Sequence, residues 1–198
     1  MQTHMNLPPY VSTLSVDEQL CAGLRLESII VERLAPAPRY PRQTVWWPRN
    51  LEARALREGI LPRSRDEGFS DLDLLVRFFA SYADGRVLIG DLGSSAPIFR
   101  YVARYEERLC RWIKSELVSN PTCLLSLEDD LVLIADEQLR YSVIGGSREA
   151  INSLEKEYGG AQALRDQFVD YVNRGELGFD EGDREWACSF LIPWSGGI

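Results

Sequence analysis

Histidine is nearly absent from this sequence, and its absence limits the chemistry that the chain can carry out. The 198 residues include one histidine, His4, and the pair His4-Met5 is one that a common cloning site encodes. We therefore interpret residues 1–4 as a cloning remnant and expect the native chain to start at Met5. Because histidine is the usual general base and the commonest metal ligand, neither a Ser-His-Asp triad nor a histidine-rich metal site is expected.

Cysteine is also scarce, and the four cysteines are far apart, with no C-x-x-C pair: Cys21, Cys110, Cys123 and Cys188. A zinc site needs clustered cysteine or histidine ligands, and no such cluster is visible. The sequence also lacks a G-x-S-x-G elbow, a P-loop and a G-x-G-x-x-G fingerprint. We therefore expect buried thiols, no bound metal, no cofactor and no catalytic residue.

Long apolar runs are missing as well. No stretch approaches the ~18–20 apolar residues that a membrane helix needs, and the start lacks the basic-then-apolar pattern of a signal peptide. With 45% hydrophobic and 26% charged residues, the composition is that of a soluble globular protein. We expect a cytoplasmic protein without a membrane partner and a single domain over residues 1–198, in which Pro8-Pro9 keep residues 5–13 extended.

What the chain does have is an imbalance of charge along its length. Residues 1–65 hold nine arginines and six acidic residues, a net charge of +3, whereas residues 66–198 hold thirteen basic and twenty-four acidic residues, a net charge of −11. An acidic surface repels nucleic-acid phosphates and attracts basic proteins by long-range steering. The balance also suits plain solubility, so the sequence argues against a nucleic-acid partner and leaves a basic protein partner as a hypothesis.

Hydrophobic periodicity and capping signals predict an α+β fold, with helices packed on a mainly antiparallel sheet of about four to six strands. Helices are expected at residues 16–34, 51–58, 71–83, 97–118, 148–158 and 161–173. Strands are expected at residues 44–47, 86–91, 122–127, 130–136, 139–146 and 186–192. Two segments remain ambiguous, because LESIIVERL (26–34) and IFRYVARY (98–105) also have the pattern of strands.

Apolar spacing also indicates which residues are buried. The first helix, which Ser15 and Glu18 begin as a capping box, places one apolar stripe near a single helical face: Val16, Leu20, Leu24, Ile30 and Leu34. The wider core is expected to include Phe79, Val102, Leu109, Trp112, Leu133, Val143 and Phe168.

Five carboxylates crowd into the ten residues from Glu128 to Glu137. They fall between three apolar runs of strand length, and aspartate is favoured in turns because its side chain bonds nearby backbone N–H groups. The stretch therefore predicts an antiparallel meander with acidic turns. A Mg²⁺ site or an acid–base pair is the competing interpretation. The glycines before Ser147 predict a strand-to-helix turn with this serine as N-cap, or alternatively an anion site.

Ten residues are candidates for contact with a protein partner: Asp129, Asp130, Asp136, Glu137, Asp180, Glu181, Asp183, Trp186, Trp46 and Trp47. The acidic candidates come from the meander turns and from the glycine-punctuated loop 176–185, where negative charge would speed association. The tryptophans are candidate anchors, because large rigid side chains often dominate binding energy, although such pairs are more often half core and half surface.

The chain resembles the immunity proteins of bacterial polymorphic-toxin and type VI secretion systems. The resemblance is carried by the early helix, the WWPRNLEARAL segment (46–56), the acidic single domain and the lack of a catalytic motif. The same segment is similar to immunity proteins paired with restriction-endonuclease-like toxins. The resemblance implies a cytosolic protein that binds a cognate basic toxin domain and blocks its active site. A carboxylate-based enzyme, with or without a metal, and a structural or regulatory interaction domain are the alternatives.

Overall fold

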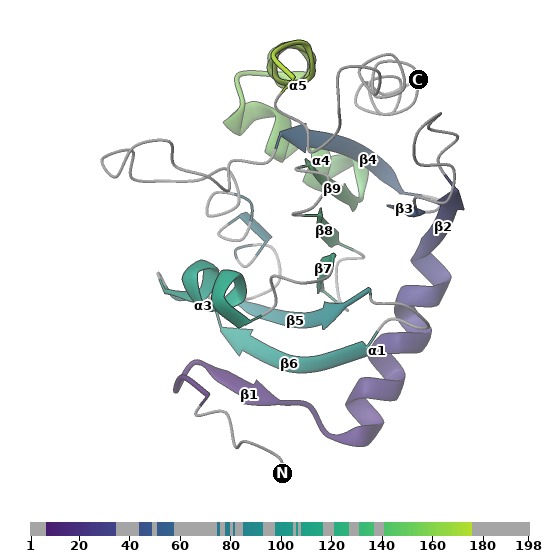
Figure 1. Ribbon diagram of the computed structural model, residues 1–198, viewed down its shortest axis with the longest axis vertical. Helices are drawn as coiled ribbons and strands as arrows, with labels where there is room; N and C mark the ends of the chain where they lie inside the picture. The colour runs from purple at the N-terminus through teal and green to yellow at the C-terminus, as the bar shows by residue number, and fades with distance from the viewer. Residues whose placement is uncertain are drawn as a thin grey trace.

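The computed structural model describes most of the chain between residues 7 and 175. The described residues are 7–34, 44–48, 51–57, 75, 78–79, 81, 85–92, 98–104, 106, 108–116, 121–126, 131–136 and 141–175. Nine strands and four helices are bounded within them, and Figure 1 shows their arrangement.

A seven-stranded sheet, antiparallel at every pairing, forms the centre of the described fold. Its strands lie in the order β1-β6-β5-β7-β8-β9-β4. Their bounds are Val11–Thr13 for β1, Glu52–Arg57 for β4, Arg86–Asp91 for β5, Ile98–Arg104 for β6, Thr122–Leu125 for β7, Val132–Asp136 for β8 and Tyr141–Gly146 for β9. The predicted α+β class is confirmed, with a larger sheet than the four to six strands expected.

Four helices accompany the sheet: α1 (Val16–Ile29), α3 (Leu109–Glu116), α4 (Arg148–Glu157) and α5 (Ala161–Asn173). The predicted caps are present, since Ser15 Oγ accepts a hydrogen bond from the Glu18 N–H and Ser147 Oγ accepts one from the Ala150 N–H. These side chains satisfy donors that a helix start otherwise leaves unpaired. In the part of the chain that the structure describes, no helix has both the length and the apolar character needed to cross a membrane.

The sheet is covered on both faces, and its central strands supply two separate cores. Neighbouring residues on one strand belong to different cores, as in the pairs Val87 and Leu88 of β5, Leu124 and Leu125 of β7, and Leu133 and Ile134 of β8. The first residue of each pair packs with α3 and α4, and the second packs with α1. Figure 1 shows α1 on one side of strands β7 to β9 and α3 on the other.

A β-bulge lets strand β6 contribute aromatic residues to both cores. The pairing of β6 with β5 skips Arg100, which is left as an extra residue between Phe99 and Tyr101. In a regular strand those two aromatic residues would share a face, because side chains alternate with a period of two. Instead Phe99 joins the α1 core, whereas Tyr101 lies in the opposite core, edge-on to Trp112 at 5.2 Å between ring centroids.

Helix α1 passes into strand β2 without a loop. The backbone turns extended at Ile30, with φ −114° and ψ 145°, and β2 (Ile30–Leu34) then pairs with β3 (Thr44–Pro48) in a separate two-stranded sheet. The predicted helix over 16–34 is therefore wrong in its last five residues. The β-branched run that begins at Ile29 favours extended backbone, which is the alternative that the segment left open.

Glycine at the end of β9 allows the two-stranded sheet to approach closely. A Cβ atom built at Gly145 would lie 2.6 Å from Cβ of Pro48 in β3, and one at Gly146 would lie 2.8 Å from Cδ1 of Leu131. Side chains already fill the space beside both glycines, so their absence of a side chain serves packing. The strand-to-helix turn that ends in the Ser147 cap is confirmed.

The helix predicted at residues 51–58 is wrong, because Glu52–Arg57 forms edge strand β4. Its sequence, EARALR, consists of helix-favouring residues, but a six-residue ladder to β9 overrides that local preference. Residues 53–56 are buried without alternation, so the segment carries no period-two signal.

The helix predicted at residues 97–118 is wrong in its first half. Ile98–Arg104 is strand β6, which lies between β1 and β5, and the helix begins only at Leu109. The alternation of the segment 98–105 was the correct signal, and the longer helical spacing joined two elements of different type.

The remaining predicted elements agree where the structure describes them. The strands at 44–47 and 86–91, the meander β7-β8-β9 and the helices at 148–158 and 161–173 are confirmed within a residue or two at their ends. In the predicted helix 71–83, Leu75, Phe78, Phe79 and Ser81 are helical, and the rest of that segment lies outside the described residues. The strand predicted at 186–192 also lies outside them.

Six of the seven predicted core residues are buried: Phe79, Leu109, Trp112, Leu133, Val143 and Phe168. Val102 is the exception, since it is only partly buried and packs against the edge of the α1 core.

Truncation of Phe168 on α5 tests this assignment of the core. The side chain is buried and lies beside Tyr171. We expect Phe168→Ala to lower the free energy of unfolding by about 3–5 kcal/mol in urea titrations, because it removes apolar contacts and leaves a cavity. Gln162→Ala, an exposed change on the same helix, serves as the control. Equal stability of the two variants would contradict the packing of α5.

The capping box of α1 predicts a pH-dependent contribution to stability. Hydrogen bonds from the Ser15 hydroxyl and backbone N–H lower the pKa of Glu18 below its ordinary value. A lowered folded-state pKa means that the carboxylate stabilises the fold above its unfolded pKa and that this contribution is lost as pH falls through the folded pKa. The difference in melting temperature between wild type and Glu18→Gln should therefore be present at pH 7 and shrink towards pH 3. A difference that is constant with pH would contradict it.

Candidate functional site

Three of the ten predicted contact residues lie within the described residues: Trp46, Trp47 and Asp136. Asp136 is the last residue of β8 and pairs with Tyr141 of β9, at the point where the meander reverses. The other seven lie outside the described residues: Asp129, Asp130, Glu137, Asp180, Glu181, Asp183 and Trp186. Their role in binding stays a prediction.

The tryptophan pair lies on β3 of the two-stranded sheet. Trp46 pairs with Glu32 of β2, and Trp47 pairs with Val31. Trp47 is only 3% exposed, so its ring belongs to the interior and offers almost no surface to a partner. The half-core interpretation holds for this residue.

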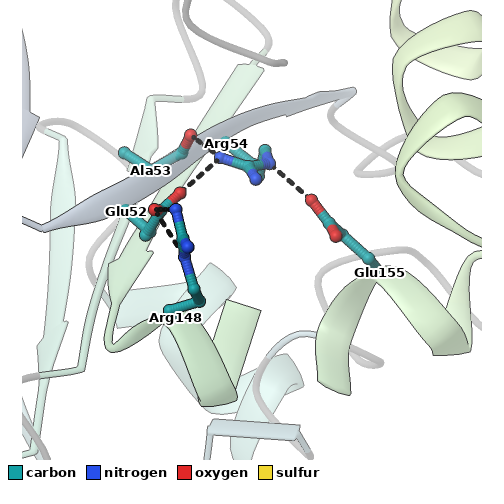
Figure 2. Close-up of polar contacts among 5 residues, drawn as sticks. All are labelled: Glu52, Ala53, Arg54, Arg148 and Glu155. Atoms are coloured by element: carbon teal, nitrogen blue, oxygen red, sulfur yellow. Dashed lines mark hydrogen bonds and ion pairs between the residues drawn. The ribbon is translucent and has the colours of Figure 1, made fainter. Parts of the chain in front are cut away.

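The most connected polar cluster of the described residues joins edge strand β4 to helix α4 (Figure 2). Arg54 Nε donates to Glu155 Oε1 at 2.7 Å, and Arg54 Nη1 donates to the Ala53 carbonyl at 2.9 Å. Arg54 also forms an ion pair with Glu52, whose other oxygen accepts from Nε and Nη2 of Arg148 at 3.2 and 3.1 Å. Arg148 and Glu155 are seven residues apart, which places both on one face of α4.

Burial separates the two halves of this cluster. The side chains of Arg54 and Glu155 are 8% and 10% exposed, whereas that of Arg148 is 76% exposed. Each buried charge has an opposite charge within hydrogen-bonding distance, which the low polarity of the interior requires. The charges of the cluster neutralise one another, and the contacts hold α4 against the sheet edge. We therefore interpret the cluster as structural.

Three of the four cysteines lie in described elements, Cys21 in α1, Cys110 in α3 and Cys123 in β7, and the first and last of them differ in environment. Cys123 is fully buried in β7, and burial raises the pKa of its thiol far above the ordinary value, which keeps it protonated. Cys21 is exposed on α1. Among the residues with defined positions, no group of three or more His, Cys, Asp or Glu side chains is placed to hold a metal ion.

The exposed face of α1 is a feature that the sequence analysis did not identify, because apolar spacing predicted a shared helical face without showing that this face is exposed. Val16, Leu20 and Leu24 are 79%, 62% and 60% exposed, while Ala22 and Leu26 face the core. We call the three exposed residues the α1 stripe. They follow one another at intervals of four, so they line a single face over about 12 Å of helix. Single exposed leucines are common on soluble proteins, but an aligned row of three is a candidate contact surface.

The exposed charges on α1 itself are all acidic. The exposed charged residues of the helix are Asp17, Glu18 and Glu27, and its one basic residue, Arg25, is half-buried. Asp17 and Glu18 suit the positive N-terminal end of the helix dipole. Glu27 lies in the last turn, where the helix dipole favours a positive charge, so its carboxylate lowers the stability of α1.

A sequence signal for the α1 stripe was available. Helix α1 has two apolar rows, Val16-Leu20-Leu24 and Ala22-Leu26-Ile29, on different faces. One buried face needs only one such row, so the second row indicates an additional contact. Sequence alone does not tell which row packs on the sheet, and the position of the core decides it.

Comparison with known proteins finds no match among protein-family models, curated proteins or solved structures. The functional argument therefore depends on the residues of this chain.

The Arg54–Glu155 pair makes a testable prediction about stability. We expect Arg54→Met to cost about 3–5 kcal/mol, because it leaves the buried Glu155 carboxylate without the cation that faces it. Glu155→Leu should cost less, since Arg54 keeps its contacts with Glu52 and the Ala53 carbonyl. The double variant should be more stable than Arg54→Met alone.

Urea unfolding of the four forms measures the coupling between the two residues. Arg148→Met, which removes the exposed arginine of the same cluster, is the control and should change stability by about 1 kcal/mol or less. Additive effects of Arg54→Met and Glu155→Leu would contradict a coupled buried pair.

Proposed function

We propose that this chain is a cytosolic immunity protein that binds a basic toxin domain and blocks its active site. The observation that carries the proposal is the α1 stripe, three large apolar side chains aligned on the surface of a protein whose net charge is −8. A protein that stays in solution alone gains nothing from that row, whereas a binding protein buries it on association.

The charge distribution supports a basic partner. Residues 66–198 carry a net charge of −11 and include the acidic candidates of the meander turns and of the loop 176–185. Such a surface accelerates encounter with a cationic protein and disfavours nucleic acid. Toxins that act on nucleic acid carry basic surfaces for the same electrostatic reason, so an acidic inhibitor is complementary to them.

The buried side chains of Arg54 and Glu155 form no part of the proposed binding surface. Arg54 and Glu155 neutralise each other at 2.7 Å and hold α4 against β4, so their charges serve the scaffold. The proposal therefore assigns binding to the surface of α1 and to the acidic segments.

A neutralisation assay tests the proposal. Each protein encoded beside this chain in its genome is expressed from an inducible promoter in a bacterial host, alone and together with this chain, and colony counts are measured. We expect one neighbour to arrest growth and this chain to restore it. Co-expression of the destabilised Phe168→Ala form should restore growth less well, which ties rescue to the folded protein.

The physical basis of rescue is then measured with the two purified proteins. We expect a complex that survives gel filtration and an association rate that falls as salt rises, because steering by exposed charge is screened. Growth arrest that this chain does not relieve would refute the proposed function. Rescue without a stable complex would indicate an enzymatic antidote instead.

A further inference from the structure

Three features of α1 are not explained by the packing of this chain on itself. The first is the α1 stripe, which leaves Val16, Leu20 and Leu24 at least 60% exposed. The second is Glu27, an acidic residue in the last turn, where the helix dipole favours a base. The third is Gly23, which lies in the middle of the helix.

Among the described residues, none packs closely against Gly23. A Cβ atom built there would have no heavy atom of the described part of the chain within 4 Å, so alanine fits there without a clash. Glycine inside a helix lowers its stability relative to alanine, because the unfolded chain has more freedom to lose. On a helix, position 23 neighbours position 20, three residues before it, and position 27, four residues after it, so the glycine adjoins both the α1 stripe and Glu27. A bare backbone at this position lets another surface approach the helix closely.

We propose that α1 is the docking helix of this protein and inserts into an apolar groove with a basic rim on the partner. This inference rests on the proposed function for the identity of the partner. The groove is filled by the three residues of the α1 stripe, Val16, Leu20 and Leu24, which act as anchors at i, i+4 and i+8. Amphipathic helices that bind in apolar grooves use anchors on one face in this way. A cation on the rim faces Glu27, and the groove wall lies against Gly23.

Charge argues for such a partner over a second copy of this chain. The exposed charges of α1 are acidic, and the whole chain carries a net charge of −8, so two copies repel each other. The α1 stripe spans about 12 Å, and one helix face is smaller than the roughly 800 Å² per partner of a standard interface.

Four variants and a matched control test the docking helix. Leu20→Asp and Leu24→Asp place a charge in the proposed groove, Glu27→Lys reverses the charge that faces the rim, and Gly23→Ala adds one methyl group. Asn152→Asp adds a charge at an exposed position of α4 and is the control. Affinity for the toxin identified by neutralisation is measured by calorimetry, and the melting temperature of each variant is recorded.

The expected results separate binding from stability. Both leucine variants should bind at least a hundredfold more weakly, Glu27→Lys at least tenfold more weakly, and Asn152→Asp within twofold of wild type. The leucine variants should melt close to wild type, since the replaced side chains are exposed. Gly23→Ala should melt higher and bind at least tenfold more weakly, opposite effects that loss of folding cannot produce. Neutralisation with unchanged affinity in the leucine variants would overturn the docking helix and leave the proposed function intact.

Two further measurements cover the remaining outcomes. Sedimentation of the purified chain from 1 to about 200 µM should show a monomer, and a dimer that Leu20→Asp abolishes would assign the stripe to a second copy and overturn the proposal.

If no neighbour is neutralised, the proposed function fails, and the helix is tested by N-ethylmaleimide labelling of the exposed Cys21 in extracts of the source cells. Protection that Leu20→Asp and high salt both remove would support the docking helix, and labelling equal to that of purified protein would overturn it.

Discussion

Burial of both faces of one antiparallel sheet is the constraint on which the rest of the described structure depends. Strands β5, β7 and β8 alternate apolar residues to two sides, so each side needs a helical layer to cover it. Helices α3 and α4 cover one side and α1 covers the other, and Figure 1 shows α3 and α1 on opposite sides of the strands. The bulge at Arg100 serves the same requirement, because it gives each core one aromatic residue from β6. The buried Arg54–Glu155 pair holds the helical layer where the sheet ends at β4.

Local signals predicted the parts of this fold that local interactions determine. The Ser15 and Ser147 caps act within a few residues of the chain, so they can be predicted from sequence. Strand β4 depends on a ladder to a distant segment, and its own residues, EARALR, have high helical propensity. Strand β6 pairs with the preceding strand β5, and its alternation was masked by apolar residues that keep helical spacing into α3. No local pattern reports that β4 lies beside β9, because that pairing joins residues about ninety positions apart.

The candidate surface was harder to predict than the fold. Residue type suggested Trp47 as an anchor, but the turn of the two-stranded sheet against β9 buries it. The exposure of Leu20 and Leu24 was also hard to predict, because large apolar side chains are usually buried. Exposure depends on which of two apolar rows of α1 meets the sheet, and that choice is made by the packing of Leu26 with the far-off strands β5 to β8. The sequence feature that indicates binding is therefore the second apolar row on α1, because the identity of each side chain does not show which row is exposed.

Because no loop separates α1 from β2, the helix and the β2-β3 ribbon form one continuous connection across the sheet. Helix α1 contacts β6, the second strand of the sheet, and the β2-β3 ribbon that continues from it contacts β9, the sixth strand. Ile30 follows Ile29 without a loop, α1 packs on the sheet, and Pro48 of β3 lies close to Gly145 of β9, so both ends of this connection are attached to the sheet. A connection that is attached to two separated strands opposes sliding of the intervening strands along one another. The strands between β6 and β9 are thereby held in register from outside the sheet as well as by their own hydrogen bonds.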